Sequence, residues 1–124
     1  MTLELRTSLV AEAGQVAVAR RLVSGYVRGR GHDDEEVAVL LVSELVTNAI
    51  LHGRGPLELR ARPSGSALRV EVHDSDPRNA PTLTDDLDPT DDGGRGLHLV
   101  DILADRWGWA ESSDGKVVWF ELDC

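Results

Sequence analysis

The spacing of apolar residues predicts the first two elements of this chain. Leu3, Leu5 and Thr7 alternate with charged residues, which is the period of a half-buried β-strand. From about Val10 to Arg28, apolar residues recur every three or four positions, which is the period of an amphipathic helix. Gly29 follows this segment, and glycine commonly ends helices. We therefore expect a strand and then a helix.

A second helix is expected to begin after the acidic run 33–36 and to stop at Gly53. Acidic residues in a first turn cap a helix and interact favourably with its dipole. On a helical wheel the apolar residues surround almost the whole circumference. These residues are Val37, Leu40, Leu41, Val42, Leu45, Val46, Ala49 and Ile50. A helix that is apolar nearly all round is expected to be buried.

The rest of the chain predicts two hairpins and a third helix. Leu57–Ala61 and Leu68–Val72 alternate as the strands of one hairpin, and Trp107–Leu122 holds another with Asp-Gly at its turn. Ser75–Gly94 has no period, whereas Leu97–Arg106 is expected to be helical. The order predicts an α/β two-layer sandwich, with about three helices on one face of a mixed, mostly antiparallel sheet.

Composition narrows the class of protein. The chain has 124 residues, about the length of one domain, so a single domain over residues 1–124 is expected. Its net charge of −9 repels nucleic acid and anionic lipid, so neither partner is expected. The N-terminus lacks the pattern of a signal peptide, and the only cysteine is Cys124. These features predict a cytoplasmic protein that acts through protein partners.

Three polar residues interrupt the apolar second helix in register. Glu44, Asn48 and His52 are spaced four residues apart and therefore form one stripe on the helix surface. Burying such groups without partners costs free energy, so a stripe that faces a cleft with a charged ligand would explain them. The other interpretation is that Glu44 reaches solvent and His52 merely caps the helix.

Glycines precede the third expected helix. The segment Gly93-Gly94-Arg95-Gly96 comes directly before Leu97, where that helix is expected to begin. Such a segment exposes backbone N–H groups at a helix N-terminus, which is a favourable place for phosphate. A Gly-Gly turn is also an ordinary way to enter a helix.

Asp74 continues the buried phase of the strand Leu68–Val72. A carboxylate at the inner end of an apolar strand can accept a hydrogen bond from an adenine amino group. The alternative is an aspartate that ends the strand in a turn with Asp76 and Pro77.

Together these pieces resemble the Bergerat ATP-binding domain shared by gyrase-type ATPases, Hsp90, MutL and histidine kinases. The N box of that family, E-x-x-x-N-x-x-x-H, is matched by Glu44, Asn48 and His52. Its adenine-binding aspartate is matched by Asp74, and its second glycine box by Gly94-Arg95-Gly96-Leu97. Within the family, the chain is similar to the stand-alone bacterial anti-sigma factors that are serine/threonine-protein kinases.

The resemblance implies a role for each matched residue. Glu44 would be the catalytic residue, as a general base or by orienting the attacking hydroxyl. Asn48 would coordinate the Mg²⁺ that bridges the phosphates of ATP, and Asp74 would bind adenine. The segment 75–94 would be the lid over ATP. The implied nucleotide-binding set is Asn48, His52, Asp74, Gly94, Arg95, Gly96 and Leu97.

The resemblance also implies protein partners. The branch binds a sigma factor and phosphorylates an antagonist protein, and Arg20 matches a position that helps to bind partners there. A solvated helical face is the other interpretation of Arg20. Related proteins often act as dimers, and the sequence leaves a homodimer open.

Two positions depart from the family pattern. The family usually follows its adenine aspartate with x-Gly-x-Gly, whereas this chain continues Ser75-Asp76-Pro77-Arg78. A threonine often follows the glycine of the last hairpin, but Lys116 follows Gly115 here. The sequence therefore leaves two functions open: a protein kinase, which the intact Glu44 favours, or a binding module without phosphotransfer, which the missing glycines favour.

Overall fold

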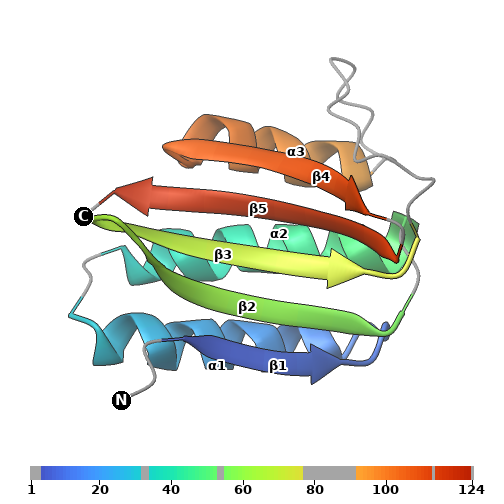
Figure 1. Ribbon diagram of the computed structural model, residues 1–124, viewed down its shortest axis with the longest axis horizontal. Helices are drawn as coiled ribbons and strands as arrows, with labels where there is room; N and C mark the ends of the chain where they lie inside the picture. Colours follow the sequence, from blue (N-terminus) through green and yellow to red (C-terminus); the bar gives the residue numbers. More distant parts are fainter. Residues whose placement is uncertain (1–3, 32–33, 53–54, 77–91, 113, 124) are drawn as a thin grey trace.

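The computed structural model describes residues 4–31, 34–52, 55–76, 92–112 and 114–123. Its elements follow the order expected from the sequence (Figure 1). They are β1 (Leu5–Leu9), α1 (Gln15–Gly29), α2 (Glu35–His52), β2 (Leu57–Ser64), β3 (Ala67–Asp74), α3 (Asp92–Leu103), β4 (Arg106–Ser112) and β5 (Gly115–Asp123). Most of the segment expected to form the lid lies outside the described residues.

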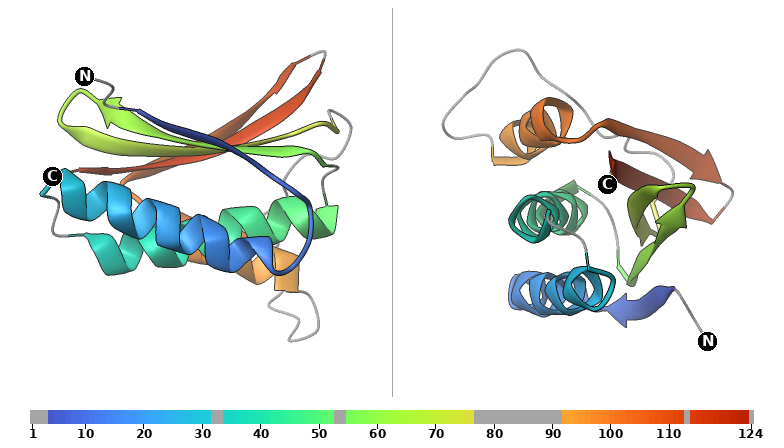
Figure 2. Two further views of the ribbon diagram at one scale, coloured as in Figure 1. Left: turned by 90° about the horizontal axis from the view of Figure 1, so that it is seen from below. Right: turned by 90° about the vertical axis from the view of Figure 1, so that its left-hand side faces the viewer.

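The five strands form one sheet in the order β1-β2-β3-β5-β4. Each of the four pairings is antiparallel, where the sequence allowed for a mixed sheet. The three helices lie side by side on one face of the sheet, with α2 between α1 and α3 (Figure 2). The predicted α/β two-layer sandwich is confirmed.

The core fills the space between these two layers. The register of β3 and β5 places Val70 opposite Phe120 and Val72 opposite Val118, and all four side chains are buried. The helices meet this face with Ala19, Val23, Val27, Leu41, Leu45, Leu97 and Val100, which are also buried. Each such large side chain contributes about 1.5–3 kcal/mol by leaving water. Apolar burial therefore fixes α2 and α3 against the end of the sheet that carries Asp74.

The side of α2 that points away from the sheet is more open than the sequence indicated. Leu40 is 39% exposed, so the prediction that the helix is buried nearly all round was wrong at this position, and Leu51 is 53% exposed as well. The sheet and the two neighbouring helices lie against the other sides of α2 (Figure 2). None of the helices in the described part of the chain is both long and apolar enough to cross a bilayer.

Two helix starts differ from the sequence-based expectation. α1 begins at Gln15 instead of Val10, because hydrogen bonds from Glu12 N–H to the Val10 carbonyl and from Gln15 N–H to the Glu12 carbonyl form turns first. α3 begins at Asp92 instead of Leu97 and ends before Arg106, which already belongs to β4. Glycine has a low helix propensity, so local propensity does not predict that Gly93–Gly96 is helical.

The other face of the sheet is uncovered and carries a network of ion pairs. Arg69 Nε donates to Glu71 Oε2 at 2.6 Å, and Arg69 Nη1 lies 3.1 Å from Glu121 Oε2. The guanidinium of Arg69 also lies 4.1 Å from the ring centroid of Trp119, which is a cation–π contact. His73 pairs with the other carboxylate oxygen of Glu71. The charged side chains on this face therefore pair with one another.

Candidate functional site

The polar stripe expected on the second helix lies within α2. Glu44 is half-buried, and Asn48 is buried with 5% of its surface exposed. Because Asn48 follows Glu44 by four residues, the two side chains leave the same side of the helix. His52 is the last residue of α2, and its side chain lies outside the described part of the structure. The carboxylate and the amide of the predicted set are thus brought together one helical turn apart.

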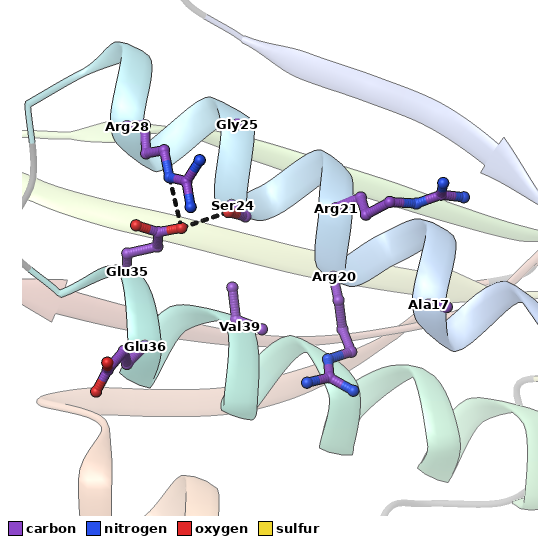
Figure 3. Close-up of a pocket in the computed structure, with 9 residues that line it drawn as sticks. All are labelled: Ala17, Arg20, Arg21, Ser24, Gly25, Arg28, Glu35, Glu36 and Val39. Atoms are coloured by element: carbon purple, nitrogen blue, oxygen red, sulfur yellow. Dashed lines mark hydrogen bonds and ion pairs between the residues drawn. The ribbon is translucent and has the colours of Figure 1, made fainter.

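The stripe is on the side of α2 that faces α3. Val39 lines a groove between α2 and α1, as Figure 3 shows. Asn48 comes nine residues later (48 − 39), and because each residue turns the helix by about 100°, it lies on the opposite side. Since α2 lies between α1 and α3, this opposite side is directed toward α3 (Figure 2).

The glycine segment forms the beginning of α3. Asp92 is the first residue of α3, so Gly93, Gly94, Arg95 and Gly96 lie in its first turns and not in a turn before it. Leu97, expected to be the first helical residue, is fully buried in the core. The first N–H groups of a helix lack partners within the helix and carry the positive end of its dipole. With α3 beginning at Asp92, the N–H groups of Gly93 and Gly94 belong to this first set, whereas those of Gly96 and Leu97 lie further along the helix.

The ends of three secondary-structure elements lie at one end of the molecule. Figure 1 shows that the C-terminal end of α2, the C-terminal end of β3 and the N-terminal end of α3 lie at the same end of the two layers. Asn48, Asp74 and Gly94–Gly96 are carried by these ends. The predicted nucleotide-binding residues are therefore grouped, although they are far apart in the sequence.

Asp74 is buried, as its phase on β3 predicted, but it has a partner that the sequence did not reveal. Lys116 Nζ lies 2.9 Å from Asp74 Oδ2, and both side chains are 2% exposed. The same ammonium donates to Asp74 Oδ1 at 3.2 Å and to the carbonyl oxygen of Asp76 at 3.1 Å. The backbone N–H of Asp76 donates to Asp74 Oδ1 at 2.8 Å. The end of β3 thus holds a buried ion pair.

A comparison with known protein families identifies the family of this chain. Residues 9–122 match the histidine kinase-like ATPase domain. The chain belongs to this family. Membership implies an ATP-utilising type of domain, and the end of the molecule that joins α2, β3 and α3 is its candidate nucleotide site.

Two individual proteins are similar to this chain. An uncharacterized protein of Streptomyces coelicolor is 41% identical over 81 residues, which are 62% of this chain and 76% of that protein. The RsbU and RsbW domains of Rv1364c from Mycobacterium tuberculosis align over 98% of this chain and 32% of theirs, with a TM-score of 0.74 and 19% identity. This chain thus spans about a third of that structure. At this identity the likeness concerns the fold.

Lys116 is the site residue that sequence reasoning missed. Its position was noted only because a lysine stands where the family often has threonine. The signal that could have found the pair is the register between β3 and β5, which places Asp74 directly opposite Lys116. Opposite charges at facing positions of neighbouring strands attract each other. The order of the strands was needed to see it, because β5 pairs with β3 only in the folded sheet.

Arg20 lies apart from the candidate nucleotide site. It is exposed on α1 and lines the groove between α1 and α2, which has a volume of about 980 Å³ (Figure 3). Arg21 and Arg28 of α1 and Glu35 of α2 also line this groove, and Glu35 points toward Arg28 (Figure 3). Arg28 Nε donates to Glu35 Oε1 at 2.8 Å, and Ser24 donates to the same oxygen. The hydrogen bond from Arg28 is the main reason that the pKa of Glu35 is lowered.

Proposed function

We propose that this protein is a Mg-ATP-dependent serine/threonine-protein kinase of the anti-sigma type, which phosphorylates an antagonist protein and binds a sigma factor. The observation that carries the proposal is the pair of Glu44 and buried Asn48, one helical turn apart on the side of α2 that faces α3. Phosphoryl transfer to a hydroxyl requires a group that positions or deprotonates the hydroxyl close to the metal ion that binds the phosphates. The carboxylate of Glu44 and the amide of Asn48 suit these two roles.

The chemistry divides among three groups that lie on two elements, α2 and α3. The amide oxygen of Asn48 is the hard oxygen ligand that Mg²⁺ prefers, and bound Mg²⁺ would neutralise charge on the phosphates. Backbone N–H groups in the first turn of α3, near Gly93 and Gly94, would hold phosphate oxygens. Glu44 would accept the proton of a serine or threonine hydroxyl as its oxygen bonds to the γ-phosphorus and ADP leaves.

Partner binding is proposed for the groove beside Arg20. Arg20 and Arg21 are exposed on a chain whose net charge is −9, so this part of α1 carries positive charge on an acidic protein. Such a local patch favours an acidic segment of a protein partner. A sigma factor and an antagonist protein are the partners proposed for it.

The kinase proposal is tested by phosphotransfer. The purified protein is incubated with γ-labelled ATP, Mg²⁺ and a heat-treated lysate as acceptor, because heating inactivates other kinases. We expect a labelled protein that contains phosphoserine or phosphothreonine, and no label with Glu44→Gln. No labelling by a protein that binds Mg-ATP would contradict the kinase proposal, and labelling that persists in Glu44→Gln would contradict the role of Glu44 as the base.

The second candidate is a regulatory binding module without phosphotransfer. The observation that favours it is the buried ion pair of Asp74 with Lys116, because it occupies the carboxylate that would otherwise contact adenine. In that case Glu44→Gln would leave partner binding unchanged, and no phosphoprotein would form with either variant.

A further inference from the structure

The carboxylate of Asp74 has its hydrogen bonds and its counter-charge supplied by the protein itself. Oδ1 accepts from the Asp76 N–H at 2.8 Å and from Lys116 Nζ at 3.2 Å, while Oδ2 lies 2.9 Å from the same ammonium. Both side chains are almost fully buried. A carboxylate whose oxygens already accept these hydrogen bonds gains little binding free energy from one more hydrogen-bond donor.

The sheet holds Lys116 in this place. An ammonium has three N–H donors, and those of Lys116 point to Asp74 and to the Asp76 carbonyl oxygen. Asp74 and Lys116 are facing residues in the β3–β5 register. Gly115, just before Lys116, lies against the backbone of Asp74 so closely that no side chain fits between the strands. The position of the ammonium therefore follows from the strand pairing.

This geometry has a consequence for a purine base. The 6-amino group of adenine is a hydrogen-bond donor, and it would approach a carboxylate already covered by a cationic donor. Moving Lys116 away would leave a buried charge without its partner, which is strongly unfavourable. The backbone donors at the start of α3 belong to another element and remain available for phosphate.

We infer that Lys116 closes the adenine-reading position of Asp74, so that this protein takes nucleoside triphosphates by their phosphates and discriminates weakly between purine bases. Lys116 is thus a specificity-determining residue of the site. The inference rests on the proposed function, because it presumes that a nucleoside triphosphate binds at this end of the molecule.

The experiment compares ATP with inosine triphosphate, which carries an oxygen in place of the 6-amino group and shares the ribose and phosphates. We expect the two dissociation constants, measured by calorimetry with Mg²⁺, to differ by less than about fivefold in the wild type. A free carboxylate would accept a charge-assisted hydrogen bond from adenine, worth about tenfold or more in affinity. Lys116→Thr, which frees Asp74, is therefore expected to prefer ATP by about tenfold or more. Lys116→Arg keeps a cation and should retain the weak preference.

The possible outcomes distinguish a failure of this inference from a failure of the proposed function. A wild-type preference for ATP above about fivefold that Asp74→Asn removes would overturn the inference, because Asp74 would then read adenine despite Lys116. The proposed function would survive that result if Asn48→Ala still abolished Mg-dependent binding. No triphosphate binding by either the wild type or folded Lys116→Thr would overturn both. The wild-type comparison decides the matter even if Lys116→Thr does not fold.

Discussion

His73 Nε2 lies 3.0 Å from Glu71 Oε1 on the uncovered face of the sheet, two residues apart on β3. This contact is the largest reason that the pKa of Glu71 is lowered to about 2, and Arg69 adds to it through its own hydrogen bond. The carboxylate of Glu71 is therefore part of what keeps the fold stable in mild acid.

Glu71→Gln should flatten the dependence of stability on pH. The pKa of Glu71 is lower in the folded chain than its ordinary value of 4.5, so its contribution is fully present above pH 4.5 and is lost as the pH falls toward 2. The contribution is at most about 3 kcal/mol. Urea unfolding at several pH values measures it. Glu12→Gln, at an exposed position, is the control, and an equally steep loss of stability in Glu71→Gln would contradict the prediction.

Gly115→Ala should destabilise the fold by several kcal/mol. A Cβ at this position would lie 1.9 Å from the carbonyl oxygen of Asp74, and the φ of Gly115 is 156°, which side chains rarely adopt. Strand β5 would have to move away from β3, so we expect a loss of about 2–4 kcal/mol in chemical denaturation. Gly25→Ala is the matched control, because nothing lies within 4 Å of its added Cβ in α1 and alanine favours helices. Equal stability of Gly115→Ala and wild type would disprove the close approach.

Asn48→Ala should remove Mg-dependent ATP binding, whereas Glu44→Gln should keep it. The first variant loses the proposed metal ligand, and the second loses only the proposed base. Calorimetric titration with ATP, with and without Mg²⁺, is expected to show a loss of about tenfold or more in affinity for Asn48→Ala. Thr47→Ala, at the neighbouring half-buried position of α2, serves as control. Unchanged binding by a folded Asn48→Ala variant would mean that the metal is held elsewhere.

Arg20→Ala should weaken the complex with the phosphate-accepting protein and leave ATP binding intact. Arg20 lies in the groove between α1 and α2, on the side of α2 opposite to Asn48. We expect a loss of about tenfold in partner affinity, mainly through faster dissociation. Arg30→Ala, at an exposed arginine just beyond α1, is the control for net charge. A change in ATP affinity with Arg20→Ala would contradict the separation of the two surfaces.

Much of the fold could be predicted because its elements have clear periods. The alternation in β2 and β3, the Asp-Gly turn before β5 and the three-to-four-residue spacing in α1 each indicate one structure. The start of α3 could not be predicted, because glycine disfavours helices and only packing of the following Leu97 and Val100 fixes that helix. The exposure of Leu40 depended on which side of α2 lacks a neighbour, and a single helix does not contain this information.

The part of the candidate site that lies on a single element could be predicted from the sequence. Glu44 and Asn48 belong to one helix, so their spacing alone places them on one face. The partner of Asp74 is 42 residues away in the sequence, on a strand whose neighbours are set by the sheet order. Comparison with the family pattern shows that Lys116 is unusual at its position. Only the register of β3 with β5 shows that it contacts Asp74.

The strand order also bears on how the protein forms during synthesis. β5 follows every other strand in the sequence, yet it lies inside the sheet between β3 and β4. The ribosome therefore releases Asp74 long before Lys116, and a nascent chain exposes the open edge of β3 until β5 inserts there. That delay leaves an unpaired carboxylate at the inner end of β3 in the nascent chain. Because Lys116 belongs to β5, the pairing of β5 with β3 both closes the hydrogen-bonded edge and neutralises that charge.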